Sequence, residues 1–331
     1  MNFSIKTTLA LLLATTPLSA LAAVPQADLR VDAINRLSAG LAAMGEYDKG
    51  IREARKLIDI SPNSPVGHYR EGELEYANGN WAKGIIKGID ALEVDPGDPE
   101  LATMVGDYYV ALELPVDARR WYDRASEIDI DHPVARAAPL ILLLYSNDIA
   151  GAAELARQLL DEGIGDRQGS HELILRAIWR EARGTGDLQA ALDFLEGHFP
   201  HLYEDEVELV AADNYKRVVI GSMMVAAGDD ARGGALLRGT LSRVDEIEAV
   251  FGPWLLGVRA SNGLGDRDST LNRLKDYSVD PYTPVLWPIR FRDASDTDLL
   301  REEPEFQKLI ADFEQNAARQ REILAQWLAA E

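Results

Sequence analysis

The 331-residue sequence contains no cysteine, and this absence excludes disulfide bonds, thiolate metal ligands and cysteine nucleophiles together. Histidine is also scarce, with five in the whole chain. His198 and His201 form the closest pair, but Pro200 lies between them and no further histidine is near, so a helix end is favoured over a metal site that needs three or four ligands. We therefore expect no metal and no cofactor.

Basic residues are few relative to acidic ones. The chain has 34 Lys and Arg against 55 Asp and Glu, which gives a formal net charge of −21. A nucleic-acid backbone or an anionic lipid surface would be repelled by this charge. The sequence also lacks a Gly-rich phosphate loop, a G-x-S-x-G turn and an H-E-x-x-H helix. We expect a non-catalytic protein that does not bind nucleic acid.

Long apolar runs are missing after the first residues of the chain. Residues 1–22 combine a positively charged start, "MNFSIK", with a brief apolar run, "TLALLLATTPL", and small residues that suit cleavage after Ala22 or Ala23. The run is shorter than the ~20 residues of a spanning helix and is broken by Pro17. A signal peptide is predicted, with export to the periplasm and no membrane insertion. A lipoprotein signal would require a cysteine at the cut site, so we do not expect a lipid anchor.

What the chain does have is an internal repeat. Small residues recur at intervals of 34, at Gly50, Gly84, Ala118 and Ala152. The same interval separates Gly72 from Gly106, Ala91 from Ala125, and Pro62 from Pro96. In each unit an apolar-periodic helix is followed by a turn such as "YANGNWAKG", and a second helix ends at a stop such as "VDPGDP". This pattern predicts stacked helix-turn-helix units.

The pattern resembles the tetratricopeptide repeat (TPR), which reads W-x2-L-G-x2-Y, then A-x3-F, then P. The third unit fits best, at Val105, Gly106, Tyr109, Ala118 and Tyr122. The second unit keeps Gly72 but has His68 at the tryptophan position and Glu75 at the tyrosine position. The resemblance implies an all-α, right-handed helical-repeat solenoid whose groove binds a protein or peptide partner.

The repeat becomes less regular along the chain. We expect regular TPR units in residues 24–160 and degenerate units in residues 161–277, where the interval drifts from 34 to 39 and then 42. Residues 278–331 are expected to form a proline-rich connector and C-terminal capping helices. Within them, "LLREEPEFQKLIADFEQ" resembles the closing segment of bacterial TPR-bearing signalling and envelope proteins. Such a cap would cover the apolar end of the stack.

Two glycines interrupt the helix of the second unit, each at a cost of up to ~1 kcal/mol relative to alanine. Gly84 lies at the position where the two helices of a TPR hairpin cross, so we expect it to allow their close contact. Gly88 lies where the family usually has a large apolar residue. The interior there is expected to be shallower, or to be filled from elsewhere.

The register of the repeat assigns nine residues to the predicted groove, namely Tyr69, Glu73, Tyr76, Asp107, Arg176, Arg180, Arg183, Arg259 and Asn262. Tyr69 and Tyr76 lie two helical turns apart and could stack on a peptide, or they could pack against the neighbouring unit. The chaperone-binding type of TPR has a lysine and asparagine clamp on these faces, and this sequence does not reproduce it.

Three of the nine form an arginine stripe on one helix, at Arg176, Arg180 and Arg183. Such a stripe could bind an acidic peptide or a carboxylated glycan. Alternatively, Arg176 pairs with Glu172 one turn earlier, and the other two complement the helix dipole before Gly184.

The sequence thus predicts a non-catalytic protein-interaction scaffold or adaptor of the bacterial cell envelope. The alternative is an accessory ligand-binding subunit of an envelope polysaccharide or export machine.

Overall fold

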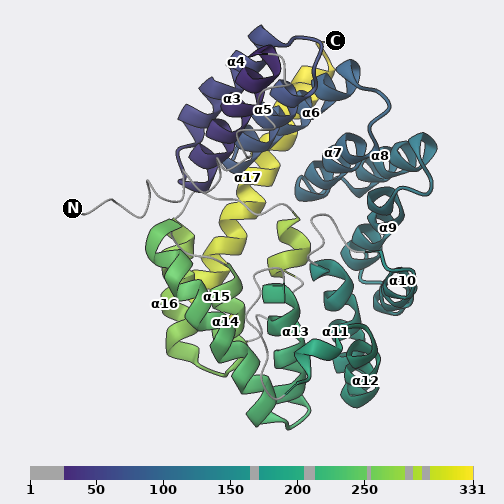
Figure 1. The fold of residues 1–331 in the computed structure, drawn as a ribbon, viewed down its shortest axis with the longest axis vertical. Coiled ribbons are helices and arrows are strands. Elements are labelled where there is room, and N and C mark those ends of the chain that lie inside the picture. The colour runs from purple at the N-terminus through teal and green to yellow at the C-terminus, as the bar shows by residue number, and fades with distance from the viewer. Residues whose placement is uncertain are drawn as a thin grey trace.

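The computed structural model describes residues 26–164, 171–204, 213–251, 255–279, 286–292 and 299–330. The predicted signal peptide and its cleavage site lie outside these ranges, as does part of the predicted proline-rich connector, residues 280–285 and 293–298. Within the described ranges all regular structure is helical, and no strand is present (Figure 1).

The helices pack as consecutive antiparallel pairs, which we number hairpins 1 to 7 in chain order. Hairpins 1 to 4 are α3 (Gln26–Ala43) with α4 (Tyr47–Ile60), α5 (Val66–Ala77) with α6 (Trp81–Val94), α7 (Pro99–Ala111) with α8 (Pro115–Ile128), and α9 (Pro133–Tyr145) with α10 (Ile149–Asp161). Hairpins 5 to 7 are α11 (Glu172–Thr185) with α12 (Leu188–His198), α13 (Asn214–Ala226) with α14 (Asp230–Phe251), and α15 (Leu255–Gly263) with α16 (Arg267–Val279). Three further elements are the 3-10 turn η2 (Pro200–Leu202), the π-helical turn η4 (Pro288–Arg292) and the long helix α17 (Pro304–Leu328). The chain is therefore an all-α solenoid of the TPR type.

The turn inside each hairpin explains the regular interval. A residue with positive φ follows the first helix of hairpins 1 to 4, at Gly45, Gly79, Glu113 and Asn147, again 34 residues apart. Glycine adopts this left-handed conformation without the ~1–2 kcal/mol cost that a side chain imposes. Asparagine also tolerates it, so Glu113 is the exceptional residue in the series.

The two helices of hairpin 2 touch at Gly72 and Gly84. A Cβ atom added to Gly84 would lie 3.2 Å from the carbonyl oxygen of Gly72 and 3.0 Å from Cβ of Tyr76. This confirms that Gly84 permits the close crossing of α5 and α6. At Gly88 an added Cβ would lie 2.7 Å from Val105 of α7. The space beside Gly88 is therefore filled from hairpin 3.

Most of the apolar interior is one continuous core that runs from α5 to α17. Hairpin 1 is different, because its contacts centre on a small separate cluster of Tyr47, Ile51 and Ala54 with Leu74 of α5. Hairpin 1 is thus joined to hairpin 2 by this small apolar cluster and by the polar contacts described below.

Helix α17 continues from the last hairpin and crosses back to the second (Figure 1, yellow). At its start, Glu305 lies 3.5 Å from Lys275 of α16. Towards its end, the side chain of Asn316 donates to the carbonyl oxygen of Gly79, and that of Gln320 accepts from the backbone N–H of Ala82, both at 3.0 Å. The C-terminal helix thus packs on the end of the stack and also connects that end to hairpin 2.

Candidate functional site

Four of the nine predicted groove residues are buried, namely Tyr76, Asp107, Arg176 and Arg259. The ring of Tyr76 stacks on that of Tyr108 with centroids 4.3 Å apart, and on that of Trp81 at 5.7 Å. Asp107 accepts a hydrogen bond of 2.8 Å from the hydroxyl of Tyr122 in the same hairpin. For Tyr76 the structure shows the packing alternative, in which the side chain contacts the neighbouring hairpin.

Tyr69, Glu73 and Asn262 are half-buried. The hydroxyl of Tyr69 donates to Glu73 at 2.8 Å, one helical turn further along α5. The guanidinium of Arg70 bonds to the other oxygen of Glu73 and lies 5.5 Å from the centre of the Tyr69 ring. Tyr69 and Glu73 are thus held together at the surface of α5, apart from the buried Tyr76.

The three arginines of the predicted stripe separate in the structure. Arg176 points into the protein. Arg180 donates to the side chain of Asn147 at 2.7 Å, and Arg183 is exposed above the ring of Trp179, 5.5 Å from its centre. Only Arg180 and Arg183 therefore remain at the surface of α11.

Arg176 and Arg259 converge on Glu172, which is 2% exposed. One oxygen of Glu172 accepts from Arg259 at 2.8 Å and from Arg176 at 3.3 Å, and the other accepts from Arg290 at 2.9 Å. Burial raises the pKa of Glu172, but the three guanidinium groups outweigh this effect and hold its pKa well below the usual range. Glu172 is therefore an ionised, buried link between α11, α15 and η4.

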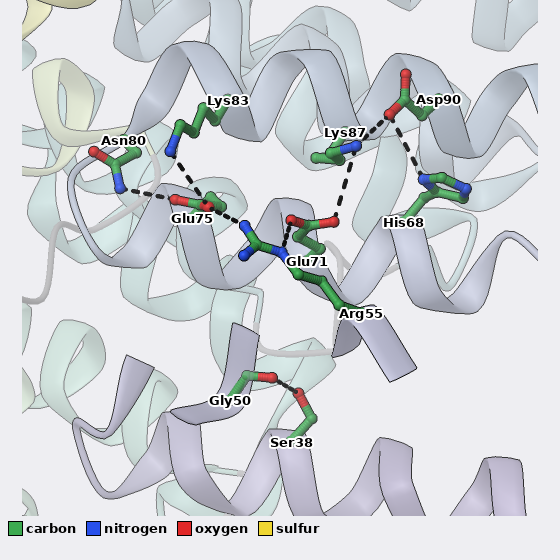
Figure 2. A network of polar contacts seen from close by, with 10 residues as sticks. All are labelled: Ser38, Gly50, Arg55, His68, Glu71, Glu75, Asn80, Lys83, Lys87 and Asp90. Atoms are coloured by element: carbon green, nitrogen blue, oxygen red, sulfur yellow. Dashed lines mark hydrogen bonds and ion pairs between the residues drawn. The ribbon is translucent and has the colours of Figure 1, made fainter. Parts of the chain in front are cut away.

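A second polar group lies between hairpins 1 and 2 (Figure 2), and we call it the polar seam. It consists of Arg55, His68, Glu71, Glu75, Asn80, Lys83, Lys87 and Asp90. The side chains of Glu71 and Glu75 are each only 4% exposed. Arg55 of α4 reaches across to both, at 2.7 Å from Glu71 and 3.3 Å from Glu75. Arg55 is the residue that hairpin 1 contributes to the polar seam.

Helix α6 and the residue before it, Asn80, supply the other partners of these carboxylates. Glu75 accepts from the side chain of Asn80 at 2.8 Å and lies 3.7 Å from Nζ of Lys83 (Figure 2). Lys87 lies 3.9 Å from Glu71 and 2.7 Å from Asp90, whose carboxylate is 3.6 Å from the ring of His68. The buried charges are thus compensated from both hairpins, as buried charges must be.

Sequence reasoning identified His68 and Glu75 as departures from the repeat pattern but missed Glu71. The signal was available, because these three polar residues lie on one face of α5 at helical spacing. The equivalent residues one repeat later, Ala102, Val105 and Tyr109, are all buried apolar or aromatic residues. The face of α5 that carries His68, Glu71 and Glu75 is therefore polar where the equivalent face of the next hairpin is apolar.

A cleft of about 350 Å³ opens beside the polar seam. It is lined by Asp48, Ile51, Arg52, Arg55, Glu75, Asn80 and Lys83. Asp48 at its rim accepts from Asn78 at 3.2 Å. Arg52 is exposed, and in the part of the chain that the structure describes no carboxylate lies within 4 Å of its guanidinium group. The cleft thus presents an exposed guanidinium group without an ion-pair partner among the described residues, with Asp48 one helical turn before it on the same lining.

The polar seam leads to a first prediction, that Arg55→Met loosens hairpin 1. Glu71 and Glu75 would lose their partner from α4, and the free energy of unfolding should fall by about 1–2 kcal/mol, since the exposed Arg55 is partly screened by solvent and Lys83 and Lys87 remain. Hydrogen exchange should accelerate in α3 and α4 while α7 and α8 stay protected.

The matched control is Lys56→Met, which removes an exposed ion pair with Glu53 on the same helix. It should change stability by less than about 0.5 kcal/mol. Equal exchange rates in the two variants would mean that the polar seam does not hold hairpin 1.

Over the described ranges, no group of three or more His, Asp or Glu side chains is arranged to hold a metal ion. None of the helices described is both long enough and apolar enough to cross a membrane.

Comparison of the chain with protein-family models and with curated proteins gives no match. Solved structures give distant likenesses. The type IV pilus biogenesis factor PilW is 13% identical over 70% of this chain and 97% of its own, with a TM-score of 0.45. Pseudomonas aeruginosa PilF is 12% identical over 87% of this chain and 100% of its own, with a TM-score of 0.36.

A Thermobaculum terrenum O-GlcNAc transferase mutant is 18% identical over 42% of this chain, with a TM-score of 0.37. The likeness covers only 27% of the transferase chain. Because all these TM-scores are below 0.5, the fold assignment rests on the helix hairpins themselves.

Proposed function

We propose that this TPR-type protein is a non-catalytic scaffold or adaptor, and that the cleft beside the polar seam binds an acidic segment of a protein partner. The fold supports the first part, because stacked helix pairs create extended surfaces that suit protein binding. Arg52 supports the second part, because it is an exposed guanidinium in a cleft with no acidic side chain within ion-pair distance among the described residues.

The charges of the cleft favour an acidic occupant. Arg55 and Lys83 already face the buried carboxylate of Glu75. Arg52 is thus left to make a bidentate contact with an incoming carboxylate, which is the strongest kind of charged hydrogen bond. Because the chain as a whole carries −21, an acidic segment would be repelled elsewhere and directed to this local positive charge.

We place this scaffold in the bacterial cell envelope, on the basis of the signal-peptide pattern in residues 1–22. The alternative function is an accessory ligand-binding subunit of an envelope polysaccharide or export machine. In that case a carboxylated glycan, rather than an acidic peptide segment, would contact Arg52. In both functions Arg52 binds a carboxylate. The two functions are distinguished by whether the bound molecule is a protein or a glycan.

The test is recovery of a partner from envelope extract by the purified wild-type protein and by Arg52→Glu. The variant should recover at least about tenfold less partner, as expected when one charge contact worth about 1.4 kcal/mol or more is lost and its sign reversed. Direct titration of the recovered molecule against both proteins should give the same ratio.

Arg183→Glu is the matched control, because Arg183 is also an exposed arginine on a helix but lies on α11, away from α4. It should bind like wild type. Loss of binding in Arg183→Glu alone would move the site to the arginine stripe, and equal recovery by Arg52→Glu and wild type would contradict the cleft. Recovery of a glycan would support the alternative function.

A further inference from the structure

The middle of the solenoid is occupied by a segment of the chain itself. Residues 286–292, which include η4, lie inside the ring of hairpins, next to α17 (Figure 1, the short yellow-green turn). Leu286, Trp287, Ile289 and Phe291 are all buried, and Trp287 is among the largest fully buried side chains. The rings of Trp287 and Phe291 pack against Phe313 of α17. This segment covers the inner face on which the sequence placed the groove.

The segment makes specific polar contacts with that inner face. The indole N–H of Trp287 donates to the carbonyl oxygen of Ala111, the last residue of α7, at 2.9 Å. Arg290, three residues later, pairs with Glu172 at 2.9 Å. Arg292, five residues after Trp287, pairs with Glu113 in the turn between α7 and α8. The inner face thus receives an aromatic residue and two arginines. Arg290 shares Glu172 with Arg176 and Arg259, and Arg292 shares Glu113 with Arg321 of α17.

Residues with a strained backbone conformation lie where this segment meets the inner face. Among the described residues, four other than glycine have positive φ, and three of them border this segment, namely Glu113 (57°), His171 (56°) and Leu286 (63°). Glu113 pairs with Arg292, His171 directly precedes Glu172, and Leu286 directly precedes Trp287. Such outliers persist where the surroundings hold them in place, and they concentrate at ligand clamps and switch regions.

We propose that the inner face is a recognition site for a protein segment with an aromatic residue followed by arginines three and five positions later, and that residues 286–292 occupy it in cis. The resident segment has the advantage of a covalent link, which gives it a high effective concentration. A partner segment of the same chemistry displaces it when further contacts raise its affinity. This site differs from the cleft beside the polar seam, because it selects a basic partner segment and uses Glu113 and Glu172.

The test uses the full-length protein and a labelled synthetic peptide with the sequence of residues 286–292. In wild type the resident segment competes with the peptide. In the double variant Arg290→Ala, Arg292→Ala the resident segment loses its contacts with Glu172 and Glu113, so the Kd for the peptide should be at least about tenfold lower than for wild type. Fluorescence anisotropy measures both values. A peptide with glutamate in place of both arginines should not bind either protein.

A second variant tests the carboxylate of the inner face. Glu113→Gly, added to the double variant, removes the acidic partner of the second arginine and suits the positive φ, so the backbone of the turn is preserved. It should weaken peptide binding about tenfold with no loss of helical content.

A measurement on wild type covers the case in which the double variant does not fold. Millimolar peptide should accelerate hydrogen exchange of the amides of residues 286–292 and leave α5 and α6 unchanged. No binding to the folded double variant, or no acceleration in wild type, would show that the segment is only part of the core and overturn the proposal. A dimer formed by exchange of the segment between two copies would also overturn it, since the occupant would then be a second copy of this chain.

Discussion

Replacing Glu172 with leucine is expected to lower the free energy of unfolding by about 3–5 kcal/mol, because removing one partner from a buried ion pair leaves the other charges buried without it. Glu172 is the common partner of Arg176, Arg259 and Arg290, and its loss would leave the first two guanidinium groups inside the protein without this carboxylate. Denaturant melts followed by circular dichroism measure the effect. A variant within about 1 kcal/mol of wild type would contradict the structural role of this cluster.

The control is Glu181→Leu on the same helix, where the removed carboxylate pairs with Arg157 near the surface. It should cost less than about 1 kcal/mol. The pH dependence gives an independent check. Since the pKa of Glu172 is lowered in the folded protein, its contribution is present above the unfolded value, 4.5, and is lost as pH falls towards the lower folded value. Wild type should therefore lose more stability below pH 4.5 than Glu172→Leu does.

The second large effect is expected at Gly233, where α13 and α14 cross. A Cβ atom added there would lie 2.5 Å from the carbonyl oxygen of Gly221, a backbone atom that cannot rotate away. Gly233→Ala should therefore lower the free energy of unfolding by about 1–3 kcal/mol in spite of the better helix propensity of alanine. The equivalent change in hairpin 2, Gly84→Ala, meets its closest atom at 3.0 Å and should stay within about 1 kcal/mol of wild type.

Gly40→Ala supplies the reference for helix propensity alone. An added Cβ at Gly40 of α3 has nothing within 4 Å, so this variant should be more stable than wild type by about 0.5–1 kcal/mol. The three alanine variants should rank in the order Gly40, Gly84, Gly233 from most to least stable in urea melts. If Gly233→Ala melts like Gly84→Ala, the two helices of hairpin 6 do not cross as closely as the structure places them.

The repeat itself could be predicted from sequence because its causes are local. The interval of 34 follows from two helices and a turn, and the turn requires a residue that tolerates positive φ, which glycine provides at Gly45 and Gly79. The crossing of α5 and α6 requires a small residue at Gly84. The drift of the later units has the same local cause, because the positive-φ residue Gly186 follows Asn147 by 39 residues and Gly228 follows Gly186 by 42.

The buried state of Arg176 and Arg259 could not be predicted in the same way. Arg176 has Glu172 one turn earlier, which in sequence looks like a surface pair. The groups that complete the cluster, Arg259 and Arg290, are 87 and 118 residues from Glu172 along the chain. No periodicity within α11 contains this information, because it depends on how the stack curves and on what fills its interior.

Glu71 was missed for a related reason. One acidic residue on a helix is usually solvated, and the burial of Glu71 depends on contacts with Arg55 of hairpin 1 and Lys87 of α6 that the sequence of α5 does not contain. The predicted binding role of Tyr69, Glu73, Arg180, Arg183 and Asn262 stays a prediction, which variants of each can address by the recovery experiment.

The connection made by α17 also bears on how the chain folds. A linear stack can nucleate at any hairpin and grow by neighbour contacts, so its folding is local and fast. Here the bonds of Gln320 to Ala82 and of Asn316 to Gly79 join residues 238 and 237 positions apart. Closing so long a loop costs entropy before its contacts form, which raises the contact order and slows the last step. The hairpins can assemble one after another from the N-terminus, whereas the closed ring forms only once the C-terminal helix has joined them.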